Sequence, residues 1–243
     1  MSTLSLVTKS SLSKSKLTLI TTLALLLSAC NHHDSDDLVV VTPTPAEYSY
    51  AVTITNLTYA QPLSPLAVIL HSDNKMWMVG DASSVALEKL AEGGDNTDFL
   101  SNSNALAASS SDGVILPGTM STVNINTTDR MATHFTAATM LVNTNDAFSG
   151  LTGIDISTMV VFDKKSWNLN VYDSGTEANS EAMDTIPGSA DGGTGFDAAR
   201  DDVDFVGYHS GVVSQDDGLS SSVLTQAHRF DNPAIKLTIT RTK

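Results

Sequence analysis

Alternation of apolar and polar residues with a period of two runs through the chain from Tyr48 to its end. Tyr50, Val52 and Ile54 alternate with smaller or polar residues near the start of this region, and Ile235, Leu237 and Ile239 do so near its end. This period is typical of strands with one buried face. It predicts about eight short strands, drawn from nine candidate segments at residues 48–55, 66–70, 114–116, 119–127, 135–142, 159–162, 167–172, 203–213 and 234–240.

Helical spacing is clear in one segment only. Residues 81–91 place Ala86 and Leu90 four positions apart, and Gly93-Gly94 provides a stop signal. Residues 97–108 are expected to form a second short helix or a loop. Many short strands without regular helix alternation predict an all-β fold. We expect an antiparallel β-sandwich of about eight strands, with one or two short helices in an insertion.

The N-terminal segment has the pattern of a secretory leader. Residues 1–16 contain three lysines and no acidic residue, and the apolar run from Leu17 to Leu27 is too short to span a bilayer. Leu27-Ser28-Ala29-Cys30 resembles the lipobox of bacterial lipoprotein signal peptides. The resemblance implies removal of residues 1–29 and lipidation of Cys30, the only cysteine.

A polar, proline-containing stretch follows and predicts a tether. Residues 30–47 then comprise the lipidated cysteine and this flexible tether, and residues 48–243 form one domain. Asn31, rather than aspartate, follows Cys30. By resemblance to lipoproteins of Gram-negative cells, this favours an outer-membrane lipoprotein of the cell envelope, facing the periplasm or the surface. The membrane is therefore one expected partner, through the anchor on Cys30.

The charge of the chain excludes one class of partner. Thirteen basic residues stand against 27 acidic ones, for a net charge of −14. Binding to nucleic acid requires a basic surface, so no nucleic acid is expected as a partner. Acidic lipid headgroups are disfavoured for the same reason. With Cys30 lipidated, no thiol remains for a disulfide or for a cysteine-ligated zinc site.

Carboxylates are concentrated in residues 171–181. Asp173, Glu177 and Glu181 lie within nine residues, and no Lys or Arg occurs between Lys165 and Arg200. Crowded carboxylates repel one another unless a positive charge lies among them. Ca²⁺ takes oxygen ligands of this kind, although the spacing does not match an EF-hand loop. A solvated acidic turn is the alternative explanation.

A second acidic position follows the strand predicted to end at residue 142. Asp146 lies in residues 143–150, just as Asp173 follows another predicted strand. Loops of a sandwich gather at its ends, so we expect these two segments to form one pocket with several carboxylates.

The chain also resembles the spondin domain, the module near the N-terminal part of F-spondin. The resemblance covers roughly residues 48–243 and is carried by an ordered series of patches: Val52-Thr53-Ile54-Thr55-Asn56, Leu63-Ser64-Pro65, Met140-Leu141-Val142, Asn145-Asp146, Gly150-Leu151, Asp173-Ser174-Gly175-Thr176-Glu177 and Asn232-Pro233. It implies a β-sandwich that binds calcium at one end through three acidic side chains, here Asp146, Asp173 and Glu177. Glu177 departs from the family, because the animal proteins have aspartate there.

These features predict a calcium-binding, lipid-anchored binding or adhesion module without catalytic activity, for an unknown protein or glycan ligand. One alternative is a structural envelope protein in which calcium only clamps loops. Another is a metal-assisted hydrolase, with a general base among four histidines: His71, His134, His209 and His228. The motif Gly207-Tyr208-His209-Ser210-Gly211 is not the Gly-x-Ser-x-Gly nucleophile elbow.

Overall fold

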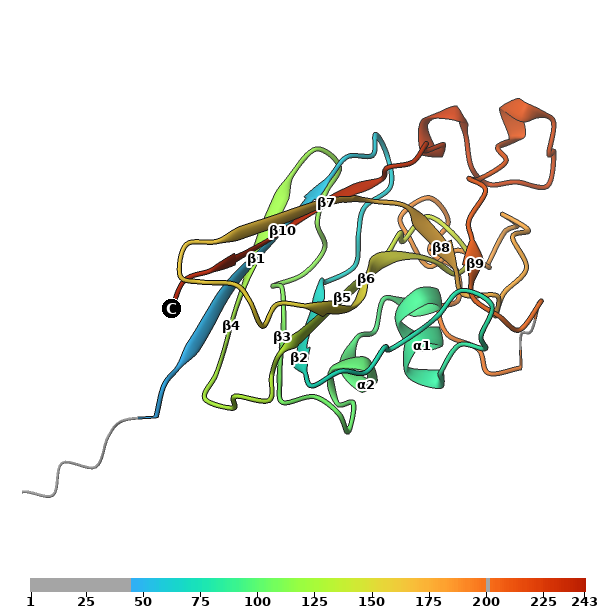
Figure 1. The fold of residues 1–243 in the computed structure, drawn as a ribbon. Coiled ribbons are helices and arrows are strands. Elements are labelled where there is room, and N and C mark those ends of the chain that lie inside the picture. Colours follow the sequence, from blue (N-terminus) through green and yellow to red (C-terminus); the bar gives the residue numbers. More distant parts are fainter. Residues whose placement is uncertain (1–44, 200–201) are drawn as a thin grey trace, which may run out of the picture. The chain divides into compact units, whose positions relative to one another are not determined.

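Two antiparallel sheets pack face to face in this protein (Figure 1). The structure, a computed structural model, describes residues 45–199 and 202–243. The four-stranded sheet has the order β4-β1-β10-β7, and the six-stranded sheet has the order β3-β2-β5-β6-β8-β9. The all-β sandwich predicted from the sequence is confirmed. Thr44–Lys243 forms one compact unit, whereas the predicted signal peptide, Cys30 and most of the tether lie outside the described residues.

The strands are short and the helices few. The strands are β1 (Tyr48–Asn56), β2 (Ala67–His71), β3 (Ala107–Ser110), β4 (Met120–Thr127), β5 (His134–Met140), β6 (Ala147–Asp155), β7 (Lys164–Leu169), β8 (Val171–Asp173), β9 (Gly207–Tyr208) and β10 (Ile235–Arg241). The helices are α1 (Val85–Gly93), α2 (Thr97–Leu100) and two 3₁₀-helices, Gln215–Asp217 and Gln226–His228. None of these described helices is long and apolar enough to cross a membrane.

The main core lies between the two sheets, where the period-two alternation directs apolar side chains. In the central strand β1, Val52 is paired with Val123 of β4 and with Ile239 of β10, and all three side chains are buried. A second apolar cluster lies between the six-stranded sheet and the two helices. Every residue of β2 is buried as a consequence, because both faces of this strand are covered.

Helix α1 starts later than its spacing predicts. The Ser84 side chain caps it by accepting a hydrogen bond from the Leu87 N–H, so residues 81–84 precede the helix. Gly94 ends it in the left-handed conformation, with φ of 67°. The side chains of Leu87 and Leu90 face the sheet from this helix, within the second cluster.

Three predicted strands are wrong in whole or in part. Residues 159–162 form a turn in which Phe162 has a φ of 76° and is exposed. Of residues 203–213 only Gly207–Tyr208 is a strand, and residues 114–116 contribute only an isolated bridge between Ile115 and Leu63. Short apolar runs do not reveal whether a partner strand lies beside them, which is the physical reason for these errors.

Strands β3 and β6 were not predicted, and residues 167–172 were predicted as one strand instead of two. Gly150 and Gly153 interrupt the apolar alternation in β6. A Cβ on Gly150 would lie 2.1 Å from the carbonyl oxygen of Ala137 in β5, so the close approach of the two strands requires glycine at position 150. Strand β7 pairs with β10, whereas β8 pairs with β6. The chain therefore changes sheets near Asn170, and this crossing carries Asp173 to the strand that begins beside Asp146.

Candidate metal centre

Asp146 lies in the tight connection between β5 and β6, against the end of β8. Ala147 is paired with Asp173 in the β6–β8 ladder, and the Ser174 N–H donates to the Asp146 carbonyl at 3.2 Å. The next turn folds over the carboxylate: the backbone N–H groups of Thr176 and Glu177 donate to Asp146 Oδ2 at 2.9 and 3.1 Å. Segments about thirty residues apart in the chain thus meet at one point.

The Asp146 carboxylate is fully buried. Its second oxygen, Oδ1, has no hydrogen-bond partner within the part of the chain that the structure describes. Burial, followed by the nearby charge of Asp173, raises the pKa of Asp146 from 3.8 to about 7, although the two backbone N–H groups act in the opposite direction. A buried, partly unpartnered carboxylate fits the oxygen ligands that a hard cation takes.

A chain of hydrogen bonds holds Asp173. Its Oδ1 accepts from the Gly175 N–H at 2.8 Å, and its Oδ2 accepts from the Asn179 side-chain amide. The Asn179 oxygen is 3.0 Å from His209 Nε2, and the Gly211 N–H donates to His209 Nδ1. Because Nδ1 accepts, the neutral ring carries its proton on Nε2 and donates to Asn179. Burial lowers the pKa of His209, which favours this neutral form.

Asn145 joins Glu177 to the following segment. Its side-chain amide donates to Glu177 Oε1 at 3.1 Å, and its side-chain oxygen accepts from the Glu181 N–H at 3.2 Å. Glu181 is itself buried, and its Oε1 accepts from the Val213 N–H at 3.1 Å. Burial raises the pKa of Glu181. The three acidic side chains of residues 171–181 therefore have different environments, of which that of Asp173 is the most exposed.

Several residues of this arrangement were not assigned from the sequence. Asn145 and Asn179 support the carboxylates, and His209 orients Asn179 instead of standing alone as a general base. Adjacency was the only available signal, since Asn145 precedes Asp146 and Asn179 lies in the acidic stretch. Nothing in the sequence indicates that His209 reaches Asn179.

The remaining histidines lie in other surroundings. His71 and His134 are direct neighbours on β2 and β5, with ring centroids 6.1 Å apart, and His71 Nε2 lies 2.9 Å from Thr136 Oγ1. His228 Nδ1 accepts from the Thr225 N–H at 3.0 Å. The four histidines considered as general bases therefore occupy three separate places.

The carboxylates are gathered but do not form a finished coordination shell. Across residues 45–199 and 202–243, no group of three or more His, Cys, Asp or Glu side chains could hold a metal ion as it stands. Both oxygens of Asp173 accept hydrogen bonds from the protein. Ion binding in this geometry requires the side chains around Asp146 to reorient.

No family model matches this chain, and no curated protein matches it significantly. The resemblance to the spondin domain stays a prediction from the patches of sequence that carry it.

Proposed function

We propose that this protein is a calcium-binding, lipid-anchored binding module of the cell envelope, without catalytic activity. One observation carries the calcium site: Asp146 is fully buried, its Oδ1 has no partner among the described residues, and Asp173 and Glu177 add negative charge beside it. Such an arrangement is unfavourable for an isolated protein at neutral pH. A divalent cation offsets both the lost hydration and the mutual repulsion.

The side chains of Asp146, Asp173 and Glu177 would hold the ion. Ca²⁺ supplies a positive charge that accepts several oxygen ligands in flexible geometry. The backbone N–H groups of Thr176 and Glu177 keep Asp146 Oδ2 in place, and the Asn179–His209 pair keeps Asp173 near it. The two acidic segments would then be cross-linked at one end of the sandwich.

Two features of the sequence support the rest of the proposal. The ordered patches of spondin resemblance favour a non-enzymatic module with calcium at one end of the sandwich. The Leu27-Ser28-Ala29-Cys30 motif favours display on a lipid anchor, with an outer-membrane location indicated by Asn31.

Calcium is expected to stabilise the fragment Thr44–Lys243 in thermal unfolding. Extracellular calcium modules bind with Kd of about 10⁻⁴–10⁻³ M, and ligand at ten times Kd adds roughly 1.4 kcal/mol to the free energy of unfolding. The Tm should therefore rise by about 3–5 °C in millimolar CaCl₂ and return to its initial value in chelator. Identical melting curves in calcium and after exhaustive chelation would count against the site. Equimolar MgCl₂ controls for general salt effects.

Lipid anchoring is tested separately with the full chain. Cys30→Ser is expected to prevent incorporation of radiolabelled palmitate and to move the protein from the detergent phase to the aqueous phase. The fold should be unaffected, because Thr44–Lys243 is a compact unit of its own. Unchanged membrane association of the variant in cell fractionation contradicts the lipoprotein assignment, and an Asn31→Gln variant controls for expression.

A further inference from the structure

A second site lies at the other end of β6 from Asp146. Asp146 precedes the first residue of this nine-residue strand, and Ser157 is the second residue after its end. Nine residues of strand span about 30 Å. Ser157 lines a pocket of about 120 Å³ whose wall also includes Arg130, Arg241, Tyr48 and Tyr50.

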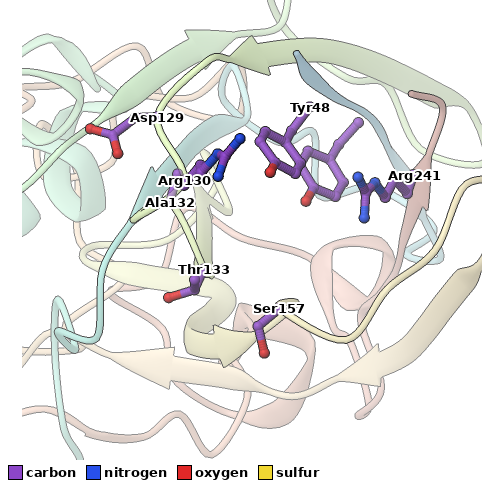
Figure 2. Close-up of a pocket in the computed structure, with 8 residues that line it drawn as sticks. Tyr48, Asp129, Arg130, Ala132, Thr133, Ser157 and Arg241 are labelled. Atoms are coloured by element: carbon purple, nitrogen blue, oxygen red, sulfur yellow. The ribbon is translucent and has the colours of Figure 1, made fainter. Parts of the chain in front are cut away.

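Two arginines line this pocket. Figure 2 shows the guanidinium groups of Arg130 and Arg241 on two sides of Tyr48. The Arg241 guanidinium carbon lies 5.0 Å from the centroid of the Tyr48 ring, and its Nη1 and Nε donate to the carbonyl oxygens of Met159 and Lys243. These contacts hold Arg241 in place with two of its five N–H donors. Arg130 projects from the loop before β5 and is exposed.

Tyr50 adds a phenol to the pocket wall. Only 3% of the residue is exposed, and it lines the pocket. Burial raises the pKa of Tyr50, so the phenol stays protonated and can donate a hydrogen bond. A phenol in the pocket wall can therefore donate to an anion that also contacts an arginine there.

One acidic side chain also belongs to the lining. Asp129 precedes Arg130, and its Oδ1 accepts a hydrogen bond from the Met131 N–H at 2.8 Å. Figure 2 shows the Asp129 carboxylate turned away from Tyr48 and from the two arginines. Its charge weakens the positive potential of the pocket without filling it.

We propose that this pocket binds a phosphate group. A guanidinium group matches the oxygens of a phosphate in geometry and charge. Two of them line this pocket, and the Tyr50 phenol supplies a further donor. A volume of about 120 Å³ accommodates one such group and excludes a large ligand. The chain as a whole carries a net charge of −14 and repels anions. The two arginines supply positive charge at this pocket, which opposes that repulsion locally.

Phosphate can reach the pocket from two sources. Tyr48 is the first residue of β1 and follows Cys30 by 18 positions. A chain of this length spans at most about 60 Å when extended, so a phospholipid headgroup is within reach if Cys30 is lipidated. Free phosphate or a soluble phosphate ester is the other source. The pocket itself depends neither on the lipid anchor nor on the calcium site.

The test compares two probes with three variants of the fragment Thr44–Lys243. Inorganic phosphate is titrated at constant ionic strength against chloride, and co-sedimentation is measured with phosphatidylglycerol vesicles and with vesicles of an uncharged galactolipid that lacks phosphate. Arg130→Ala should weaken binding of phosphate by about tenfold or more, and Tyr50→Phe should weaken it less. Arg229→Ala, which removes an exposed arginine paired with Asp217 outside the pocket, should bind like the wild type.

The outcomes distinguish a lipid headgroup from a soluble phosphate, and they test the phosphate pocket independently of the calcium site. Vesicle binding that needs phosphatidylglycerol, needs Arg130 and is competed by inorganic phosphate identifies a lipid headgroup. Binding of inorganic phosphate alone, again dependent on Arg130, identifies a soluble ligand. The proposal is overturned if neither probe binds, or if Arg130→Ala binds as well as Arg229→Ala. The calcium response should be the same in all three variants, so failure here leaves the calcium site untouched.

Discussion

Replacing Asp146 by asparagine is expected to abolish the calcium-dependent rise in Tm and, in chelator at pH 8, to make the domain more stable than the wild type. Asparagine keeps an oxygen that can accept from the Thr176 and Glu177 N–H groups. It removes the buried charge, which is both the ligand for calcium and the cause of repulsion with Asp173. The gain in chelator follows from burial and repulsion alone, so the loss of the calcium response is the result that tests the metal site.

The sign of the effect depends on pH. The pKa of Asp146 is raised in the folded state to about 7, so the folded state holds this proton more tightly than the unfolded state. In calcium-free protein, the resulting stability is present below about pH 4 and is lost as pH rises to about 7. The loss is on the order of 4 kcal/mol, against about 1–3 kcal/mol for burying the new amide. Asp146→Asn should therefore raise the Tm in chelator at pH 8 by roughly 3–8 °C and lower it near pH 4.

Three further variants calibrate this result. Asp112→Asn changes the charge equally at an exposed position before β4 and should alter neither the Tm nor the calcium response. Asp173→Asn should also abolish the response. Glu177→Gln should mainly weaken calcium affinity, because Glu177 lies on the same turn as Asp173 and its loss does not separate the two segments. If Asp146→Asn keeps the full calcium response, the segments do not share an ion and the spondin assignment of this site is wrong.

Gly175→Ala is expected to be the most destabilising small substitution at the site. Gly175 has a φ of 74°, and a Cβ there would lie 2.2 Å from the Phe205 carbonyl oxygen and 2.8 Å from the Phe205 nitrogen. The left-handed conformation alone costs an alanine about 1–2 kcal/mol. Displacing the Phe205 backbone adds roughly 1–3 kcal/mol, the usual cost of overpacking.

Gly192→Ala is the matched control. Gly192 has nearly the same φ, 75°, but no atom lies within 4 Å of its Cβ position. The difference in Tm between the two variants therefore reports the contact with Phe205, and we expect Gly175→Ala to melt roughly 3–10 °C lower. It should also lose the calcium response, because the Gly175 N–H positions Asp173 Oδ1. Equal melting temperatures for the two variants would show that the turn does not pack on Phe205 in solution.

Part of the candidate site was open to prediction because its chemistry is local. Asp173, Glu177 and Glu181 are crowded in the sequence itself, and a run of acids without nearby cations has the same electrostatic meaning in any fold. Their different environments were not predictable. Glu181 is buried against the Val213 N–H, whereas Asp173 stays partly exposed, and burial depends on segments far away in the chain.

The sequence by itself determined that this protein is a β-sandwich, because period-two alternation requires strands with one face turned to a common core. It also determined where the acidic residues are concentrated. Only the tertiary structure decided that β7 and β8 belong to different sheets, that Asp146 is covered by the Thr176–Glu177 turn, and that Arg130 and Arg241 share a pocket. Strand pairing and loop closure join residues that are distant along the chain, and local propensity carries no information about such partners.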